Sequence, residues 1–201
     1  MLKWLLGRSV PRELDDGQVM YLAEHLSLSP FMIDLATLDG MRVFEMAPMT
    51  PAQKGSLVAE LRLLGLVACL YSLYEPGANL SRSSIVKVTA ATAERFVARP
   101  FFTPDERTQL TAAKGGLPEW IIYDMPDAKP MLFNQRYEWY CALWPNPAAL
   151  GSSEKGAKAA IQIMRCANLE EVPGLILPLV LAVGLVFRIM LPCASIVLKD
   201  L

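Results

Sequence analysis

The sequence has little of what catalysis and nucleic-acid binding usually require. Of its 201 residues, one is histidine and 19% are charged, whereas soluble domains carry about 25% charged residues. The 19 lysines and arginines nearly balance the 20 aspartates and glutamates, which leaves a formal net charge of −1. A nucleic-acid-binding protein needs a basic surplus to meet the phosphates, so this balance argues against that class of partner.

Cysteines are few and far apart. Cys69, Cys141, Cys166 and Cys193 form no C-x-x-C pair, and each lies among apolar neighbours. A zinc site or a secreted disulfide framework needs closer and repeated spacing. We therefore predict buried free thiols, which behave as small hydrophobic side chains.

The motifs of common active sites are also absent from the sequence. It contains no G-x-S-x-G nucleophile elbow, no G-x-x-x-x-G-K-[ST] phosphate loop and no G-x-G-x-x-G turn. His25, which a Ser-His or Cys-His pair would have to use, lies on an amphipathic helical pattern. We predict no catalytic residue, no cofactor and no metal ligand, and we expect the protein not to be an enzyme.

The most informative stretch is the apolar C-terminal segment, residues 172–198. Arg188 is its one charged residue, and a membrane-spanning helix needs about 20 predominantly apolar residues. Each large apolar side chain contributes about 0.3–0.6 kcal/mol in a bilayer, so together they outweigh the cost of one arginine. The segment therefore favours a C-terminal transmembrane helix. The predicted span is represented by Leu175, Leu179, Leu181, Val183, Leu185 and Phe187.

An alternative is that a soluble protein buries this segment in its own core. Pro173, Pro178 and Pro192 interrupt the segment, and Arg188 lies within it. Residues 175–187, however, show no polar stripe of the kind that a surface helix carries. A soluble helix with this sequence would have to be covered on all sides.

Arg188 needs a polar neighbour if the segment spans a membrane. Its long side chain can reach a lipid headgroup, or it can pair with an acidic residue of a neighbouring helix. Lys155, Lys158 and Arg165 precede the segment, and only Lys199 follows it. By the positive-inside rule, this asymmetry places the N-terminal domain on the cytoplasmic or matrix side of an organellar or bacterial inner membrane.

The pattern of the whole chain predicts a mainly α fold, with an irregular domain of about five to seven helices before the apolar segment. Composition divides it into a short amphipathic N-terminal segment (1–14), a helical domain (15–116), a Pro- and aromatic-rich segment with one helix (117–150), a connecting helix (151–171) and the apolar segment (172–198). The first segment holds Trp4 between Lys3 and Arg8, which fits either a membrane interface or a frayed terminus.

The strongest helix of the domain is predicted over residues 51–74. The T-P-A-Q sequence at 50–53 is a capping box with proline at the first helical position. We expect Glu60 and Arg62 to keep the first half of this helix solvated. Residues 63–70 are apolar on nearly every side, which predicts a buried core helix for the second half.

Other helix starts carry similar signals. They are predicted at Asp15 or Asp16, at Ser29-Pro30, at Ser83 or Ser84, and at Thr103-Pro104-Asp105-Glu106, which is a second capping box. The β-branched sequence at 85–90 fits a strand by composition, but its apolar spacing favours a helix. Gly115-Gly116 is the predicted end of the helix that begins near residue 104.

Residues 118–147 combine five prolines with large aromatic side chains. We expect a short extended piece at 119–125 and a helix from Phe133 onward. Tyrosine and tryptophan gather at membrane interfaces and protein contacts, whereas an aromatic stripe at helical spacing also fits ordinary core packing. The residues predicted to face a partner are Trp120, Tyr137, Trp139, Tyr140 and Trp144.

These patterns lead to one expected function and two alternatives. We expect a non-catalytic, membrane-anchored accessory or assembly subunit of a larger membrane protein complex, with other subunits and lipid as partners and no nucleic acid. The first alternative is a soluble all-helical binding or inhibitor-type adaptor that buries its C-terminal segment. The second is an enzyme with a pocket for a lipid-like substrate, which would need a large cavity with at least two converging acids.

Overall fold

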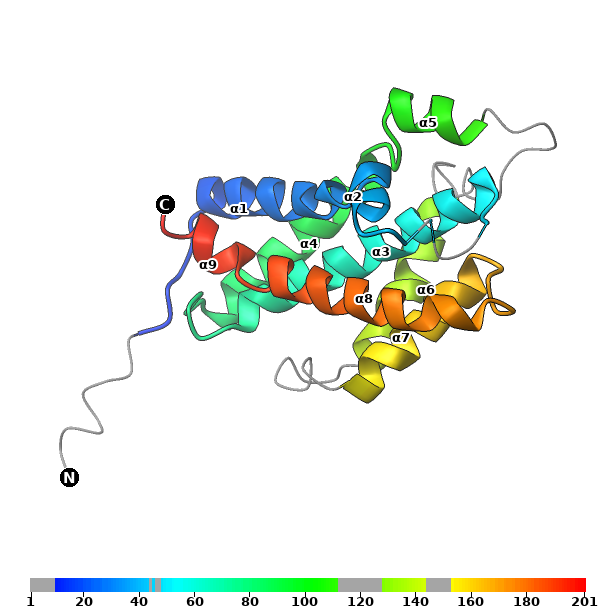
Figure 1. Ribbon diagram of the computed structural model, residues 1–201. Coiled ribbons are helices and arrows are strands. Elements are labelled where there is room, and N and C mark those ends of the chain that lie inside the picture. The colour runs from blue at the N-terminus through cyan, green and yellow to red at the C-terminus, as the bar shows by residue number, and fades with distance from the viewer. Residues whose placement is uncertain (1–9, 44, 46–47, 112–127, 144–152) are drawn as a thin grey trace.

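The computed structural model describes residues 10–43, 45, 48–111, 128–143 and 153–201 (Figure 1). In chain order, the described elements are α1 (Asp16–Leu28), η2 (Ser29–Met32), α2 (Leu35–Gly40), α3 (Pro51–Tyr71), η3 (Ser72–Tyr74), α4 (Arg82–Ala98), α5 (Pro104–Thr111), α6 (Ala128–Leu143), α7 (Ser153–Cys166), η6 (Pro173–Leu175), α8 (Ile176–Met190) and α9 (Cys193–Val197). Elements labelled η are 3-10 turns.

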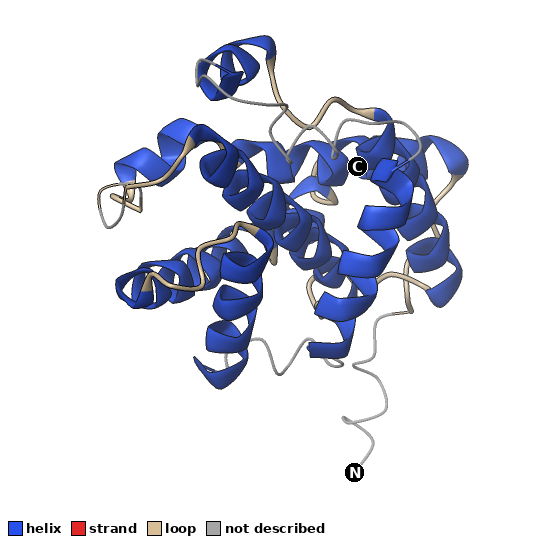
Figure 2. Cartoon of the chain, turned by 90° about the vertical axis from the view of Figure 1, so that its right-hand side faces the viewer, coloured by secondary structure: helices blue, strands red, loops and turns tan. Residues whose placement is uncertain are grey.

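Every regular element in the described ranges is helical, as Figure 2 shows. Extended pairing in these ranges is limited to an isolated parallel bridge between Arg12 and Leu80. This bridge ties the segment before α1 to the segment before α4, and the two helices pack side by side. The mainly α fold expected from the sequence is confirmed, and an apolar helix, α8, lies near the C-terminus.

The central helix of the fold is α3. It contacts α1, α5, α6, α7 and α8, and every position from Gly55 to Tyr71 is buried. Neighbouring helices cover it on all sides, which is why its second half can be apolar all round without a polar stripe. The prediction of a buried core helix over residues 63–70 is confirmed.

Two stretches of helix in the described residues are long and apolar enough to cross a membrane, by length and composition only. They are Pro51–Tyr74, which begins with α3, and Ile176–Val197, which comprises α8 and α9. In the most apolar 18-residue window of each stretch, 94% of the first is buried inside the protein and 33% of the second. The two stretches thus have different surroundings: α3 is enclosed by the domain, and α8 lies at its surface (Figure 1).

Helix starts follow capping chemistry that is visible in the sequence. Asp15 caps α1 and Thr50 caps α3, each in a capping box that a glutamine closes three residues later. At α5 the same reciprocal pattern joins Thr103 and Glu106. The Thr103 N–H donates to Glu106 Oε2 at 2.9 Å, and the Glu106 N–H donates to Thr103 Oγ1 at 3.2 Å.

One predicted cap lies at a different serine. The start of α4 is capped by Ser81, and neither Ser83 nor Ser84 takes that role. The hydroxyl of Ser84 instead accepts a hydrogen bond from the N–H of Leu14 at 2.9 Å, which fastens the segment before α1. The β-branched residues 85–90 lie within α4, so their helical spacing prevails over their strand composition.

The Ser29-Pro30 pair opens only a short 3-10 turn, η2. The backbone becomes extended at Ile33, and a new helix, α2, begins after Asp34. The carboxylate of Asp34 accepts a hydrogen bond from the N–H of Thr37 at 2.7 Å and so caps α2. The predicted second helix is therefore divided into a turn and a helix that meet at a bend.

The expectation that Glu60 and Arg62 solvate α3 is wrong. Glu60 is 0% exposed and Arg62 is 1% exposed. Each charge has a counter-charge from another helix: Glu60 lies 3.1 Å from Nε of the partly exposed Arg136, and Arg62 pairs with the buried Glu106. Buried charges persist when they are paired and hydrogen-bonded, and the sequence gives no direct sign of partners so distant along the chain.

Several predictions fall outside the described residues. These are the amphipathic start around Trp4, the helix end at Gly115-Gly116, the extended piece at 119–125, and the aromatic residues Trp120 and Trp144. The predicted helices around Tyr137 and from 154 onward are present as α6 and α7.

Candidate functional site

The C-terminal helix α8 has two contrasting faces. Its inner face packs against α3 and α7, and the side chains there are buried. They are Leu179, Ala182, Val183, Val186, Phe187 and Met190. These positions recur at the spacing of an α-helix, so one side of the helix completes the core of the domain.

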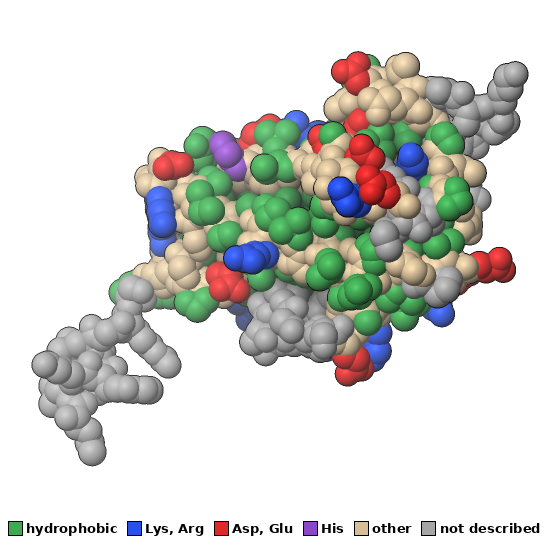
Figure 3. All heavy atoms as spheres, in the orientation of Figure 1, with side chains coloured by type: hydrophobic (Ala, Val, Ile, Leu, Met, Phe, Trp, Pro, Cys, Tyr) green, Lys and Arg blue, Asp and Glu red, His purple; other side chains and the backbone are tan. Residues whose placement is uncertain are grey.

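The outer face of α8 is apolar as well, and none of the residues that the structure describes covers it. Leu177 is 68% exposed and Leu181 is 63% exposed, and Leu185 and Ile189 continue the same face. Figure 3 shows hydrophobic side chains gathered over the middle of the surface on which α8 lies, with most charged side chains toward its edges. Single exposed leucines are ordinary, but a contiguous apolar patch marks a contact surface.

An apolar groove lies beside this face. It has a volume of about 240 Å³, and α8, η2 and α2 form its walls. No charged side chain lines it: the residues are Met32, Ile33, Thr37, Leu38, Met41, Leu61, Ala182, Leu185, Val186, Ile189 and Met190. The methionines give the groove adaptable walls, because their side chains are unbranched and flexible. The outer face of α8 and this groove together are called the α8 surface below.

Helix α7 borders the other side of α8 and keeps a charged face in water. Its Ala159, Ala160 and Ile163 are buried, while Lys158 pairs with Glu154 at 2.7 Å on the exposed side. A helix with one strongly polar face remains in water or at a membrane surface. In this conformation, a partner could contact α8 along its outer face, and the charged face of α7 would remain in water beside that contact.

Contacts within the described residues do not explain why two positions of α8 carry glycine and arginine. A Cβ atom added to Gly184 would meet nothing within 4 Å, so internal packing does not require glycine there. Arg188 is exposed, and none of the described residues forms an ion pair or hydrogen bond with it. A glycine in a helix interior costs about 1 kcal/mol relative to alanine, so both residues suit a contact made with another molecule.

The structure divides the predicted membrane-span residues between the two faces. Leu175, Leu179, Val183 and Phe187 lie inside the domain, with exposed fractions of 5% or less. Leu181 and Leu185 lie on the outer face. One face of the helix is therefore open to a partner or a bilayer, because α3 and α7 cover the opposite face.

The aromatic residues predicted to face a partner are also divided. Tyr140 lies in the core, where its hydroxyl donates a hydrogen bond to Glu60 at 3.1 Å, and burial raises its pKa. This burial is a correction to its predicted place on a partner surface. Tyr137 and Trp139 are half-buried on α6, and Trp120 and Trp144 lie outside the described residues.

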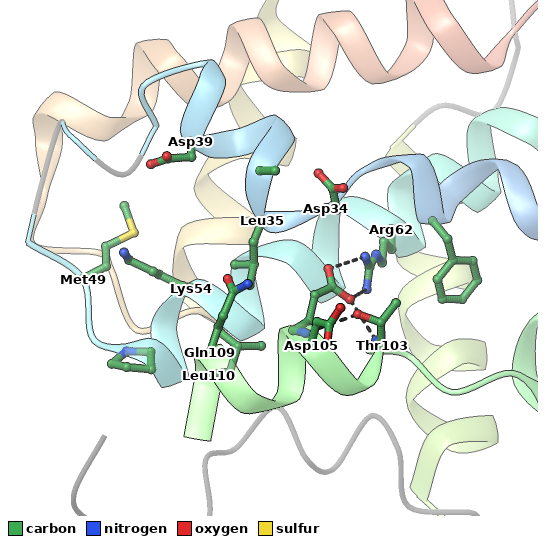
Figure 4. A pocket seen from close by; sticks show the side chains of 14 residues that line it. Asp34, Leu35, Asp39, Met49, Lys54, Arg62, Thr103, Asp105, Gln109 and Leu110 are labelled. Atoms are coloured by element: carbon green, nitrogen blue, oxygen red, sulfur yellow. Dashed lines mark hydrogen bonds and ion pairs between the residues drawn. The ribbon is translucent and has the colours of Figure 1, made fainter. Parts of the chain in front are cut away.

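A second cavity, of about 630 Å³, opens between α2, the start of α3 and α5 (Figure 4). It is the kind of feature that the enzyme alternative requires, since Asp34, Asp39, Asp105 and Glu106 line it. Asp34 caps α2, and hydrogen bonds from Thr37 lower its pKa despite partial burial. Glu106 forms an ion pair with Arg62. Figure 4 shows Asp39 and Asp105 on opposite sides of the cavity, so these two carboxylates do not face a common point.

Arg62 is held from three directions at the back of this cavity. Its Nε donates to the carbonyl of Ile33 at 2.7 Å, Nη1 donates to the carbonyl of Phe101, and Nη2 reaches Glu106 at 2.7 Å. Its guanidinium also lies 5.2 Å from the ring centre of Phe31, within range of a cation–π contact. The hydrogen bonds of this guanidinium join η2, α3 and α5, so Arg62 has a structural role.

Sequence reasoning missed both the apolar groove and the Arg62 site. The groove arises where η2 crosses α8, a contact between distant parts of the chain. In the described ranges, no group of three or more His, Cys, Asp or Glu residues is arranged to hold a metal ion. Comparison of the chain with protein-family models, with curated proteins and with solved structures found no match.

Proposed function

We propose that this protein is a non-catalytic accessory or assembly subunit of a membrane protein complex, and that it binds through the α8 surface. The observation that carries the proposal is the uncovered apolar outer face of α8, with Leu177 and Leu181 each more than 60% exposed. The hydrophobic effect favours covering such a surface, at about 25 cal/mol for each Å² of apolar area removed from water.

The composition of the α8 surface favours a helix of a partner subunit as the molecule that covers it. Gly184 leaves space in which another helix backbone can approach closely, which is a common arrangement between helices in membranes. Lipid chains alone gain nothing from such a gap. Arg188, one turn further along, offers a charge to a carboxylate of the partner or to a lipid phosphate.

The proposed mechanism is scaffolding. The inner face of α8 belongs to the core of the domain, so a partner bound on the outer face would be held rigidly to the whole domain. The charged face of α7 would stay in water beside the membrane, in keeping with the N-terminal domain lying on the cytoplasmic or matrix side. A complete crossing of the bilayer by α8 would require it to separate from α7.

The proposal is tested by changing the outer face of α8 without disturbing its inner face. We expect the unaltered chain to sediment with the membrane fraction of cells that express it, and the double variant Leu177→Ser/Leu181→Ser to move to the soluble fraction. The matched control is Val86→Ser/Met131→Ser, because these side chains are 61% and 56% exposed on other helices. Far-UV circular dichroism verifies that both variants remain folded.

Membrane association that persists equally in both double variants would disprove the role of the α8 surface. Flotation of the purified chain with protein-free phospholipid vesicles would assign the surface to lipid in place of a partner helix. The partner-helix version instead expects no flotation of the isolated chain, together with loss of membrane association in Gly184→Leu.

One observation favours the soluble adaptor as a second candidate. The inner face of α8 is buried in its own domain, which is the arrangement that the adaptor alternative expects for the C-terminal segment. In that case the α8 surface would bind an apolar segment of a soluble protein. A full-length chain that is monodisperse without detergent, and absent from membranes, would favour this candidate.

A further inference from the structure

Three sulfur atoms meet where α3, α8 and α9 come together. Cys69 lies in the second half of α3 and is 0% exposed, and its Sγ lies 3.6 Å from Sδ of Met190, at the end of α8. Cys193, the first residue of α9, has its thiol close enough to that of Cys69 for the two to interact, and its Sγ also donates to the carbonyl of Ile189 at 3.6 Å. The short turn between α8 and α9 therefore places a thioether and a thiol against a second thiol from the central helix.

This group is chemically distinctive because all three of its side chains are soft ligands. Thiolate and thioether sulfur select Cu(I) over harder ions such as Mg²⁺ or Ca²⁺. Metal–sulfur bonds of about 2.3 Å in a trigonal site would place the sulfur atoms about 4 Å from one another. The distance of 3.6 Å between Cys69 and Met190 is close to that spacing, so small side-chain movements would open a three-coordinate site.

We propose that Cys69, Met190 and Cys193 form a binding site for a single Cu(I) ion. Binding replaces the two thiol protons: the two thiols and one Cu(I) give a bis-thiolate complex, with Met190 as the neutral third ligand, and two protons leave to solvent. Copper stays in the +1 state, so the step needs no oxidant or reductant. The site does not depend on the proposed function, because Cys69 and Cys193 lie outside the α8 surface, and Met190, which also lines its groove, would bind the ion through its sulfur whether or not a partner covers that surface.

Access to the site is through Cys193. Cys69 and Met190 are buried, whereas Cys193 is only partly buried and connects the sulfur group to the surface. Cys193 can accept the ion first and pass it inward to the other two ligands. The Ser29 hydroxyl lies beside both thiols, and as a hard oxygen donor it competes poorly with sulfur for Cu(I).

The test is a competition for Cu(I) between the reduced full-length chain and a chromogenic Cu(I) chelator under anaerobic conditions. We expect one Cu(I) for each chain, and a loss of affinity of about tenfold or more in Cys193→Ser and in Cys69→Ala. Met190→Leu, which preserves volume, should weaken binding by a smaller factor. Cys141→Ser and Cys166→Ser serve as controls, because these thiols lie on α6 and α7.

Cys193→Ser keeps the assay interpretable if Cys69→Ala fails to fold, because position 193 is partly exposed. X-ray absorption at the copper edge should show three sulfur neighbours in the unaltered chain and two in Met190→Leu. Cu(I) binding that is unchanged in Cys193→Ser, or that is lost equally in the two controls, would overturn the proposal. Two sulfur neighbours in the unaltered chain would remove Met190 from the site and overturn the three-sulfur assignment.

Discussion

Nη2 of Arg62 lies 2.7 Å from Oε1 of Glu106, although only 1% of the arginine side chain and 8% of the glutamate side chain are exposed. The pair joins the central helix to α5, a helix of only eight residues whose own sequence is polar. Because the charges are buried, each depends on the other to offset the loss of hydration.

Removal of one member of this pair should therefore be costly. We predict that Arg62→Met lowers the free energy of unfolding by about 3–5 kcal/mol, because it leaves the Glu106 carboxylate buried without its counter-charge. Urea denaturation measures the change. The exposed pair of Arg42 and Glu45 provides the control, and Arg42→Met should change stability by less than about 1 kcal/mol. Similar losses of unfolding free energy in both variants would show that the buried pair stabilises the fold no more than the exposed pair.

The two faces of α8 should respond differently to the same substitution. Leu179→Ala removes a side chain that is 0% exposed and should cost about 2–5 kcal/mol, whereas Leu181→Ala, at a position that is 63% exposed, should cost far less. Denaturation of the two purified variants under identical conditions gives the comparison. Equal destabilisation would mean that the outer face is covered in the isolated chain.

Glycine at position 184 should reduce the stability of the isolated chain. We predict that Gly184→Ala raises the free energy of unfolding by about 1 kcal/mol, since the new methyl group meets nothing within 4 Å and alanine favours the helix. Gly65→Ala is the matched control within α3, where the Cβ atom would lie 3.1 Å from Cδ1 of Ile33. A gain at Gly65 as large as that at Gly184 would contradict this explanation.

The contact between α1 and α4 should weaken in acid. A hydrogen bond from Arg99, together with the charges of Arg99 and Arg95, holds the pKa of Glu24 below its usual value of 4.5. A carboxylate with a lowered folded-state pKa stabilises the fold above pH 4.5, and this contribution is lost as the pH falls through the folded value.

The variant Glu24→Gln tests this pH dependence. It should be less stable than the unaltered chain at pH 7, and the difference should shrink as the pH falls below about 4.5. Unfolding curves for both proteins between neutral and acidic pH provide the measurement. A difference that stays constant over this range would assign the effect of the substitution to packing.

The local parts of the fold could be predicted from the sequence because their causes are local. The caps at Asp15, Thr50 and Thr103 depend on side chains that bond to backbone groups three residues away, and such spacing is visible in the chain. The burial of the second half of α3 follows from its lack of any polar stripe.

The candidate site could be predicted only in part, because its remaining features depend on contacts between distant segments. The apolar character of α8 is evident from its sequence, but α3 and α7 determine which face remains open. Likewise, Glu60 and Arg62 look like solvated residues until Arg136 and Glu106 are brought to them by other helices. Hydropathy records how apolar a segment is and does not record what covers it.

The position of α3 in the chain also bears on synthesis. One of the helices that enclose it, α8, is synthesised long after α3, so part of α3 stays uncovered in the nascent polypeptide until α8 has emerged from the ribosome. During that interval a chaperone or a membrane insertion factor would meet a stretch that satisfies the length and composition of a membrane span. The packing of α8 onto α3 is what withdraws α3 from such encounters.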